Sequence, residues 1–310
     1  MNMSILAALL AVYVLWGGTY LAMKVAIETM PPFLMAGVRF ISAGLIVYCW
    51  QRAAGVPNPT GRQCRQAAVV GVVMLLGGNG SLVWAEQYVS SGVAAVVFAT
   101  VPLWITLLSW LVLRESRPSL LTGAGLALGI SGIILLVGDF GGETGVTGVP
   151  WIGYAALTAS TLFWAAGSLY SRRAELPTVP LMGSALQMLA GGLACLLVGM
   201  AAGESSAIHW ELVSFRSWLA LGYLVLFGSI VGFSAYVWLL KVADPTLVTT
   251  NTYVNPVVAV VLGWLLADER MTMESGLAAV VILVAVVLIH KAGQRRASGA
   301  AKLAAEPQEG

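Results

Sequence analysis

The chain has 310 residues, of which 59% are hydrophobic and only 10% are charged, and its formal net charge at pH 7 is +2. Soluble globular proteins are about half apolar and a quarter charged, so a mean hydropathy of +0.88 excludes a water-facing surface and predicts a polytopic membrane protein. The small net charge offers no basic surface for nucleic acid. The three cysteines and two histidines are scattered along the chain, so we expect no disulfide framework, no metal site and no cofactor.

Ten apolar segments are long enough to be membrane spans. A bilayer core of about 30 Å requires about 20 apolar residues in each helix, and charged, glycine and proline clusters separate the segments. The predicted spans lie near residues 5–27, 33–50, 67–86, 91–112, 119–138, 150–170, 179–201, 217–240, 245–266 and 275–291. The first lacks a basic region before it and is longer than a signal-peptide core, so we expect it to be retained.

The positions of Lys and Arg predict the orientation, because these residues gather in the cytoplasmic loops of membrane proteins. With the N-terminus in the cytoplasm, twelve of the 16 Lys and Arg residues lie on the inner side and two on the outer side. An even number of spans returns the C-terminus to the cytoplasm. The tail at residues 293–310 is predicted to be disordered.

The first and sixth spans contain similar aromatic patterns. WGGTYLAMK begins at Trp16 and places Tyr20 four residues later, on the same helix face. WAAGSLY begins at Trp164 and places Ser168 at the same spacing. We expect these four side chains to line a shared cavity. The alternative is helix packing combined with an aromatic belt at the membrane surface.

Two basic residues lie within predicted spans, where charge is costly. Arg39 is well inside the outer end of the second span, and Glu86 ends the third span on the same side. We expect these two side chains to form an ion pair at the outer mouth; the alternative is that Arg39 binds a carboxylate of the solute. Lys24 is nearer the end of its span and is expected to extend its ammonium group toward the membrane surface.

The third span contains GGNGSLVWAE, residues 77–86. A phosphate-binding loop would need a strand before the glycines, whereas these glycines lie within an apolar helix and favour close packing. The amide of Asn79 needs hydrogen-bond partners in a dry interior, and we expect a cavity or the solute to provide them.

The ninth span contains TTNTYVNP, in which Asn251, Tyr253 and Asn255 precede Pro256. Proline removes a backbone donor and frees a carbonyl one turn back. Transporter sites are often built at such helix breaks, so we expect these three side chains to contact the solute. The alternative is that the amides only satisfy the carbonyls that the kink frees.

The chain contains one helix sequence twice. TVPLWITLLSWLVLRE at residues 100–115 and VNPVVAVVLGWLLADE at residues 254–269 are offset by 154. At that offset the matched pairs are Trp84 with Trp238, Pro102 with Pro256, Trp110 with Trp264, and Glu115 with Glu269. Both prolines are expected to bend their helices. The alternative to duplication is chance similarity between apolar helices.

This repeat predicts the architecture. Each half holds five spans, an odd number, so the second half must enter the membrane inverted relative to the first, a plan that recurs in transporters. The expected fold class is an all-α polytopic membrane protein with ten transmembrane helices arranged as two inverted five-helix repeats. The first repeat is expected at residues 1–140 and the second at residues 141–292.

The segments WGGTY, PPFLMAGVRF, GGNGSLVWAE, SGVAAVVFATVPL and YVNPVVAVVLGW occur in this order. Together they resemble the EamA-type members of the drug/metabolite transporter superfamily, and among them the bacterial YedA-like inner-membrane transporters, over residues 5–291. The resemblance implies ten helices, cytoplasmic termini, a central cavity and export of small metabolites such as amino acids. The small multidrug relatives carry an acidic residue in the first helix for proton coupling. This chain has none there, so that mechanism is not carried over.

We therefore expect a secondary transporter of the bacterial inner membrane, with a small-molecule solute and the lipid bilayer as its partners, present as a monomer or homodimer. The alternatives are transport of a drug, nucleotide-sugar or lipid, and a membrane protein that does not transport. A phosphate-bearing substrate would require several buried Lys or Arg residues, and only two lie within spans. No Asp or Glu is expected at mid-depth, which weakens proton antiport and leaves an intramembrane enzyme without catalytic groups.

Overall fold

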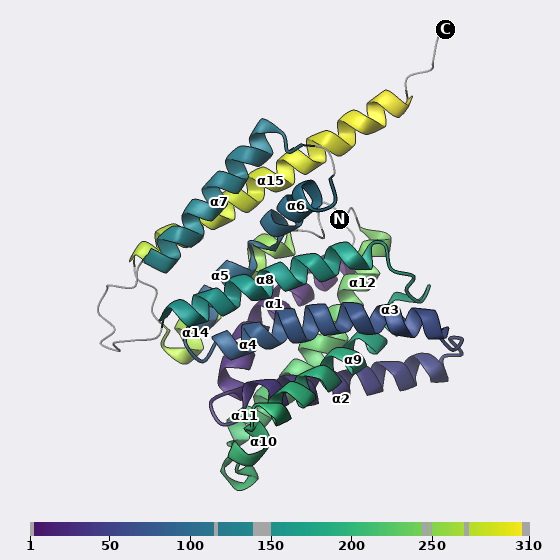
Figure 1. Cartoon of the computed structure of the whole chain (residues 1–310), viewed down its shortest axis with the longest axis vertical. Helices are drawn as coiled ribbons and strands as arrows, with labels where there is room; N and C mark the ends of the chain where they lie inside the picture. Colours follow the sequence, from purple (N-terminus) through teal and green to yellow (C-terminus); the bar gives the residue numbers. More distant parts are fainter. Residues whose placement is uncertain are drawn as a thin grey trace.

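The computed structural model of the chain describes residues 3–114, 117–138, 150–243, 248, 250–269 and 273–305. Every element within these ranges is helical (Figure 1). Seven of the described helical segments are long and apolar enough to cross a membrane, and three further apolar helices are shorter. The chain is therefore an α-helical, multi-spanning membrane protein.

The helices follow the predicted spans closely. The unbroken ones are α1 (Met3–Ala26), α2 (Pro32–Ala53), α7 (Leu120–Gly138), α8 (Pro150–Ser171), α9 (Pro180–Ala201), α14 (Asn251–Ala267) and α15 (Met273–Ala305). The third span consists of α3 (Gly61–Gly71), the π-helix η1 (Val72–Gly80) and α4 (Ser81–Ala85). The eighth consists of α11 (Phe215–Tyr223), the π-helix η3 (Leu224–Val231) and α12 (Gly232–Val242). The fourth is divided into α5 (Ser91–Phe98) and α6 (Val101–Leu111).

α15 continues as a helix to Ala305, into the segment at residues 293–310 that was predicted to be disordered. The segment AGQRRASGAAKLAA that follows the apolar part of α15 contains six Ala, two Arg, one Lys and one Leu. These residues have the highest helix propensities, so the helix that begins in the apolar region extends beyond it.

The second helices of the two halves have matching lengths and ends. α2 and α9 both begin at a proline, both span 22 residues, and are 148 residues apart. Each is followed by a glycine in the left-handed region, Gly55 with φ of 80° and Gly203 with φ of 79°. From the third span onward, corresponding residues of the two halves are 154 apart, since α3 begins at Gly61 and α11 at Phe215. The additional residues lie after α9, where two short helices form, α10 (Glu204–Ala207) and η2 (Trp210–Leu212).

The helices pack in corresponding pairs. α2 packs against α9, and α7 packs against α15 at one edge of the molecule (Figure 1). α1 contacts α11, η3, α12 and α14, while α8 contacts the corresponding elements of the first half, α3, η1, α4, α5 and α6. The largest buried apolar cluster joins α1, α4, α5 and α15. α1 and α8 are therefore each surrounded mainly by helices of the other half.

Two surface ion pairs connect loops that the predicted topology places on the same side of the membrane. Arg62 Nε lies 3.0 Å from Glu175 Oε2, between two loops predicted to be cytoplasmic. Arg216 Nη1 lies 3.9 Å from Glu28 Oε1, between two loops predicted to be external. Exposed pairs of this kind contribute little stability, but their positions agree with the order of the spans.

Candidate functional site

Trp16 on α1 anchors one group of aromatic side chains. Its indole Nε1 donates to the carbonyl oxygen of Gly228 at 3.1 Å. Its ring lies 5.0 Å from the ring of Tyr236 and 6.4 Å from that of Phe233, measured between centroids. Trp16 is only partly buried. The indole is therefore fixed in orientation while part of its surface stays accessible.

Tyr20, one turn further along α1, belongs to a second aromatic group that joins the two halves. Its ring contacts Phe98 edge-on at 6.3 Å, and Phe98 contacts Trp164 edge-on at 5.3 Å. Edge-to-face contacts in this range are favourable. The Tyr20 hydroxyl takes part in none of the hydrogen bonds found among the described residues, and the side chain is partly buried. The structure thus brings Tyr20 and Trp164 together, with Phe98 between them.

The hydroxyl group of Ser168 has a hydrogen-bond partner, whereas the amide of Asn79 has none among the described residues. Ser168 Oγ donates to the carbonyl oxygen of Trp164 at 2.7 Å, so its hydroxyl is satisfied within α8. Asn79 lies in η1, is partly buried, and makes no side-chain hydrogen bond within the part of the chain that is described. Its neighbour Gly78 faces Trp164, whose ring would be 3.0 Å from a Cβ added there. Wide helical turns of the π type occur frequently at functional sites.

The ninth span contributes one unsatisfied amide. Asn255 Oδ1 is buried and has no hydrogen-bond partner among the described residues, whereas Asn251 Oδ1 accepts from Thr252 at 3.3 Å. α14 approaches α1 closely here, since a Cβ on Gly17 would lie 2.6 Å from Val258. The side chain of Tyr253 lies outside the described part of the structure.

The two prolines occupy different positions. Pro102 is in the first turn of α6, directly after a break at Ala99 and Thr100 that separates it from α5. Proline is well suited to a first helical turn because its missing N–H would have no partner there. Pro256 lies inside α14, which runs on both sides of it.

Arg39 and Glu86 are both buried, with exposed fractions of 6% and 0%, but the structure shows no ion pair between them. Arg39 Nε donates instead to Ser229 Oγ at 3.1 Å, and the guanidinium lies 4.8 Å from the centre of the Phe40 ring. Neither Arg39 Nη1 nor either carboxylate oxygen of Glu86 has a hydrogen-bond partner among the described residues. Arg39 and Glu86 are therefore both buried, and no ion pair joins them in the described part of the structure.

Lys24 was expected to extend its ammonium group toward the membrane surface, and in the structure its side chain is partly buried. Its ammonium group donates to the backbone carbonyl oxygens of Glu86 and Val89, the latter at 3.0 Å. These carbonyls belong to the turn that follows α4, where helical carbonyls lack partners within the helix. A cation is favourable at a helix C-terminus, so Lys24 holds this turn against α1.

Glu269, which follows α14, holds the other side of the same turn. Its carboxylate accepts from Ser91 N at 2.9 Å, from Ser91 Oγ at 2.7 Å and from Gly92 N at 3.3 Å. These are the free amides at the start of α5, so a side chain of the second half caps a helix of the first. Glu115, the matched residue in the other copy, lies outside the described residues.

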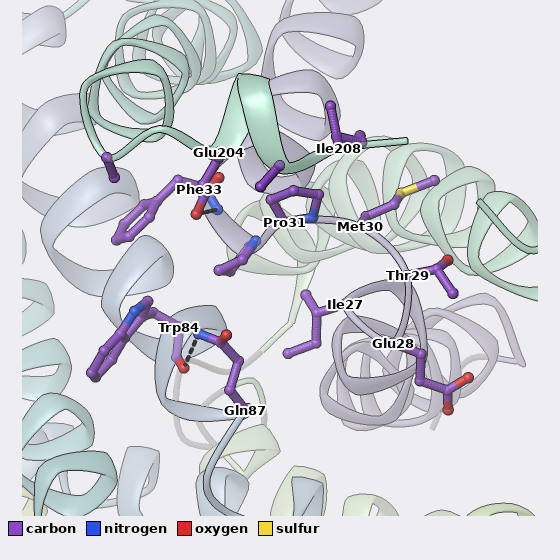
Figure 2. A pocket seen from close by; sticks show the side chains of 13 residues that line it. Ile27, Glu28, Thr29, Met30, Pro31, Phe33, Trp84, Gln87, Glu204 and Ile208 are labelled. Carbon is purple, nitrogen blue, oxygen red and sulfur yellow. Dashed lines mark hydrogen bonds between the residues drawn. The ribbon is translucent and has the colours of Figure 1, made fainter. Parts of the chain in front are cut away.

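A cavity of about 460 Å³ opens at the ends of helices predicted to face outward (Figure 2). Trp84 and Gln87 lie on one side of it, and Phe33 and Glu204 on another. The Glu204 carboxylate accepts from Phe33 N at 3.2 Å and Leu34 N at 2.8 Å, capping α2. Trp84 and Gln87 flank the buried Glu86 in sequence, so this cavity lies close to the turn that carries it.

Sequence reasoning missed several members of this region. Phe98, Phe233 and Tyr236 are apolar or aromatic residues in apolar helices, and only their contacts distinguish them from lipid-facing neighbours. The capping role of Glu269 had a partial signal, because Glu269 belonged to the matched pairs of the repeat. No signal in the sequence indicated the complete burial of Glu86.

The described helices form a bundle of apolar segments, seven of them long enough to cross a membrane, with aromatic, amide and charged side chains at their contacts. The profile of the EamA-like transporter family matches residues 2–138 and 151–290. The chain therefore belongs to the EamA-like transporter family.

Individual relatives agree with this assignment. A protein of Escherichia coli strain K12 described as the uncharacterized inner membrane transporter YedA is 42% identical over 283 residues, which cover 91% of this chain and 89% of the relative. Protein PagO of Salmonella typhimurium strain LT2 is 28% identical over 297 residues, which cover 93% of each chain. A solved structure described only as a crystal structure of a protein matches with a TM-score of 0.60 at 20% identity, covering 93% of this chain and 98% of that one. That similarity concerns the fold alone.

Proposed function

We propose that the protein is a secondary transporter that exports small metabolites, with amino acids as the favoured class, across the bacterial inner membrane by alternating access. Its ten helices would form two inverted five-helix repeats, the first within residues 1–140 and the second within residues 141–292, with both termini in the cytoplasm. The inner-membrane location is supported by the description of the relative YedA.

The observation that carries this proposal is the correspondence between the halves. α2 pairs with α9 and α7 with α15, which are the pairs that an in-plane two-fold axis would bring onto each other. The third span of each half contains a π-helix, which is η1 in the first half and η3 in the second half. Alternating access in inverted-repeat transporters moves one set of helices against the other around a fixed site, so this correspondence supports such a mechanism.

The two central tryptophans support a site between the halves. Trp16 lies against Gly232, where an added Cβ would be 2.6 Å from its Nε1, and Trp164 lies against Gly78. Gly78 and Gly232 are 154 residues apart, and Trp16 and Trp164 are 148 apart, which are the offsets of the corresponding helices. Trp16 of the first half thus lies against a glycine of the eighth span, and Trp164 of the second half lies against a glycine of the third span.

The chemistry of this region favours an amphipathic solute. The aromatic surfaces of Trp16, Tyr20 and Trp164 suit an apolar body, and the amides of Asn79 and Asn255 suit hydrogen-bonding ends. Arg39 is available for a carboxylate because its Nη1 has no partner among the described residues. A free amino acid has each of these features.

The proposal is tested by counterflow in proteoliposomes. Vesicles containing purified protein and loaded with unlabelled amino acids are placed in a bath of the labelled compounds at equal pH. We expect transient accumulation of at least one labelled amino acid that protein-free vesicles do not show. Exchange of none of the twenty would contradict the proposed substrate class.

A further inference from the structure

The helices around the aromatic side chains form two groups, which we name after their central helices. The α1 group consists of α1, α11, η3, α12 and α14, and the α8 group consists of α8, α3, η1, α4, α5 and α6. Within each group, the central helix contacts every other member. Alternating access rocks one bundle of helices against another, so the contacts between these two groups determine which side is closed.

The two groups meet on the side of the membrane that is predicted to be external. α5, the outer part of the fourth span, packs against α14 and also contacts α1. A Cβ on Gly92 would lie 3.1 Å from Cγ2 and 3.7 Å from Cβ of Val260. α6, the inner part of the same span, packs against α8, α7 and α15, and among the described residues it has at most marginal contact with α1, α12 or α14. The groups are therefore joined on the outer side and diverge on the inner side.

Glu269 joins the groups by hydrogen bonds as well. It follows α14 in the α1 group, and its carboxylate accepts from Ser91 N, Ser91 Oγ and Gly92 N of α5 in the α8 group. The amides of a first helical turn lack partners within the helix, and the helix dipole favours a negative charge there. Lys24 of the α1 group reaches the same turn from the other side, through the carbonyls of Glu86 and Val89.

The backbone after α14 directs Glu269 toward α5. Asp268 has a φ of 50°, a left-handed conformation that residues other than glycine adopt rarely, and Glu269 N donates to the carbonyl oxygen of Gly263 at 3.1 Å. A side chain at Gly263 would displace the carboxylate, because its Cβ would overlap Glu269 Oε2. Arg114, 154 residues before Asp268, has a φ of 54°, so both copies of the repeated helix end in the same turn.

α5 does not depend on Glu269 to remain a helix. Ser90 Oγ accepts from Val93 N at 3.3 Å, which is a local N-cap. If Glu269 moved away at the outer surface, water could take its place, and exchange of protein for water hydrogen bonds has a small net free energy. The contact can therefore favour one state of the protein without preventing the other.

We propose that Glu269 is the latch of an outer gate formed by α5 and α14. Its carboxylate holds the start of α5 while the protein is closed to the outside, and it releases Ser91 and Gly92 when the two groups separate to let the solute leave. This inference rests on the proposed function, and it adds the contact that opens and closes on the outer side.

Cross-linking tests whether α5 and α14 must separate during transport. Gly92→Cys combined with Val260→Cys places two Cβ atoms 3.7 Å apart, within the range of about 3.5–4.5 Å that a disulfide requires. We expect oxidation with copper phenanthroline to abolish counterflow in this double variant and reduction with dithiothreitol to restore it. Val260→Cys alone, oxidised in the same way, controls for the three native cysteines and should transport normally. A cross-linked protein that keeps its counterflow would overturn the inference and leave the proposed function intact.

Thiol labelling tests the latch without any solute. A membrane-impermeant methanethiosulfonate, added outside right-side-out vesicles, should reach position 260 only when the outer side opens. We expect Glu269→Ala to accelerate labelling of Val260→Cys by about fivefold or more, the usual effect on an equilibrium of losing one cap. Gly263→Ala should act in the same direction, and it replaces Glu269→Ala if that variant does not fold.

Glu211→Ala, at an exposed glutamate that is also predicted to be external, is the matched control and should leave the labelling rate unchanged. Equal rates with and without Glu269 would show that the contact is only a helix cap and would overturn the inference. Accelerated labelling in a protein that exchanges no amino acid would support the latch and contradict the proposed substrate class.

Discussion

The ammonium group of Lys24 donates to the backbone carbonyl of Glu86 and leaves the carboxylate of the same residue without a hydrogen bond. The turn after α4 is thus stabilised through its main chain, while its acidic side chain stays available. Because Glu269 caps the next helix from the second half, this turn is held between α1 and the end of α14.

Removing the Lys24 contact should destabilise the protein. Lys24→Met keeps the length of the side chain but leaves the carbonyls of Glu86 and Val89 without their donor, which typically costs about 1–3 kcal/mol. We expect a lower midpoint of thermal unfolding in detergent, measured by differential scanning fluorimetry. Lys291→Met, at an exposed lysine of α15, should leave the midpoint unchanged; an equal loss in both variants would refute the capping role.

Glu269 and Ser91 should be energetically coupled. Glu269→Ala removes the acceptor for three donors at the start of α5, and loss of a helix cap typically costs about 1 kcal/mol. Ser91→Ala removes only the hydroxyl donor. The two substitutions combined should destabilise less than the sum of the separate effects, because they share one contact. Thermal unfolding of the two single variants and the double variant measures this, and strict additivity would speak against the contact.

The crossing of the third span with α9 depends on two glycines. A Cβ on Gly191 would lie 2.6 Å from the carbonyl oxygen of Gly71, and a Cβ on Gly71 would collide with the backbone of Gln187. Gly191→Ala and Gly71→Ala should each destabilise the protein by about 1–3 kcal/mol, the usual cost of overpacking. Gly123→Ala, where a Cβ would meet nothing within 4 Å, is the matched control and should be tolerated. Size-exclusion profiles and unfolding midpoints distinguish these outcomes.

The aromatic lining should determine transport more than stability. Trp164→Ala removes the aromatic surface that we propose contacts the solute. An aromatic contact of the usual strength contributes about 0.5–1.5 kcal/mol, so we expect counterflow of amino acids to slow by about two- to tenfold. Trp151→Ala, at a mostly exposed tryptophan near the start of the same helix, should transport normally. If Asn79→Ala and Asn251→Ala both left transport intact, the proposed site would be incorrect.

The orientation can be checked by fusion. A reporter attached after Lys291 should lie in the cytoplasm, because an even number of spans returns the chain to that side. Alkaline phosphatase and green fluorescent protein fusions at this point give opposite signals for the two orientations. Periplasmic activity would require a different number of spans.

Sequence reasoning was most successful where apolar length alone decides structure. The boundaries of α2 and α9 were predicted to within a few residues because prolines and glycines mark their ends. Pro102 was predicted to bend a continuous fourth span; in the structure that span is divided just before the proline, at Ala99 and Thr100. Tyr20 and Trp164 are joined through Phe98, whereas Trp16 belongs to a separate aromatic group. The role of all three in binding the solute stays a prediction.

The surroundings of Glu86 could not be predicted, for a physical reason. An acidic residue at a span end normally faces the aqueous interface, and nothing in GGNGSLVWAE distinguishes that case from complete burial. Burial results from contacts with residues distant in sequence, such as Lys24 and the segment after α14. Likewise, the use of the Ser168 hydroxyl within its own helix depends on a rotamer that the sequence does not reveal.

The π-helix η1 has a consequence for evolution and engineering of this chain. Each residue in an α-helix turns the chain by about 100°, whereas wider turns with hydrogen bonds to the fifth residue rotate it less. The direction in which Leu82, Val83 and Glu86 point is therefore set by the winding of the nine residues before them. Deleting one residue from η1 would restore tighter winding and swing the Glu86 carboxyl around the helix axis toward a different neighbour. The length of this segment is thus under constraint even where its individual apolar side chains are interchangeable.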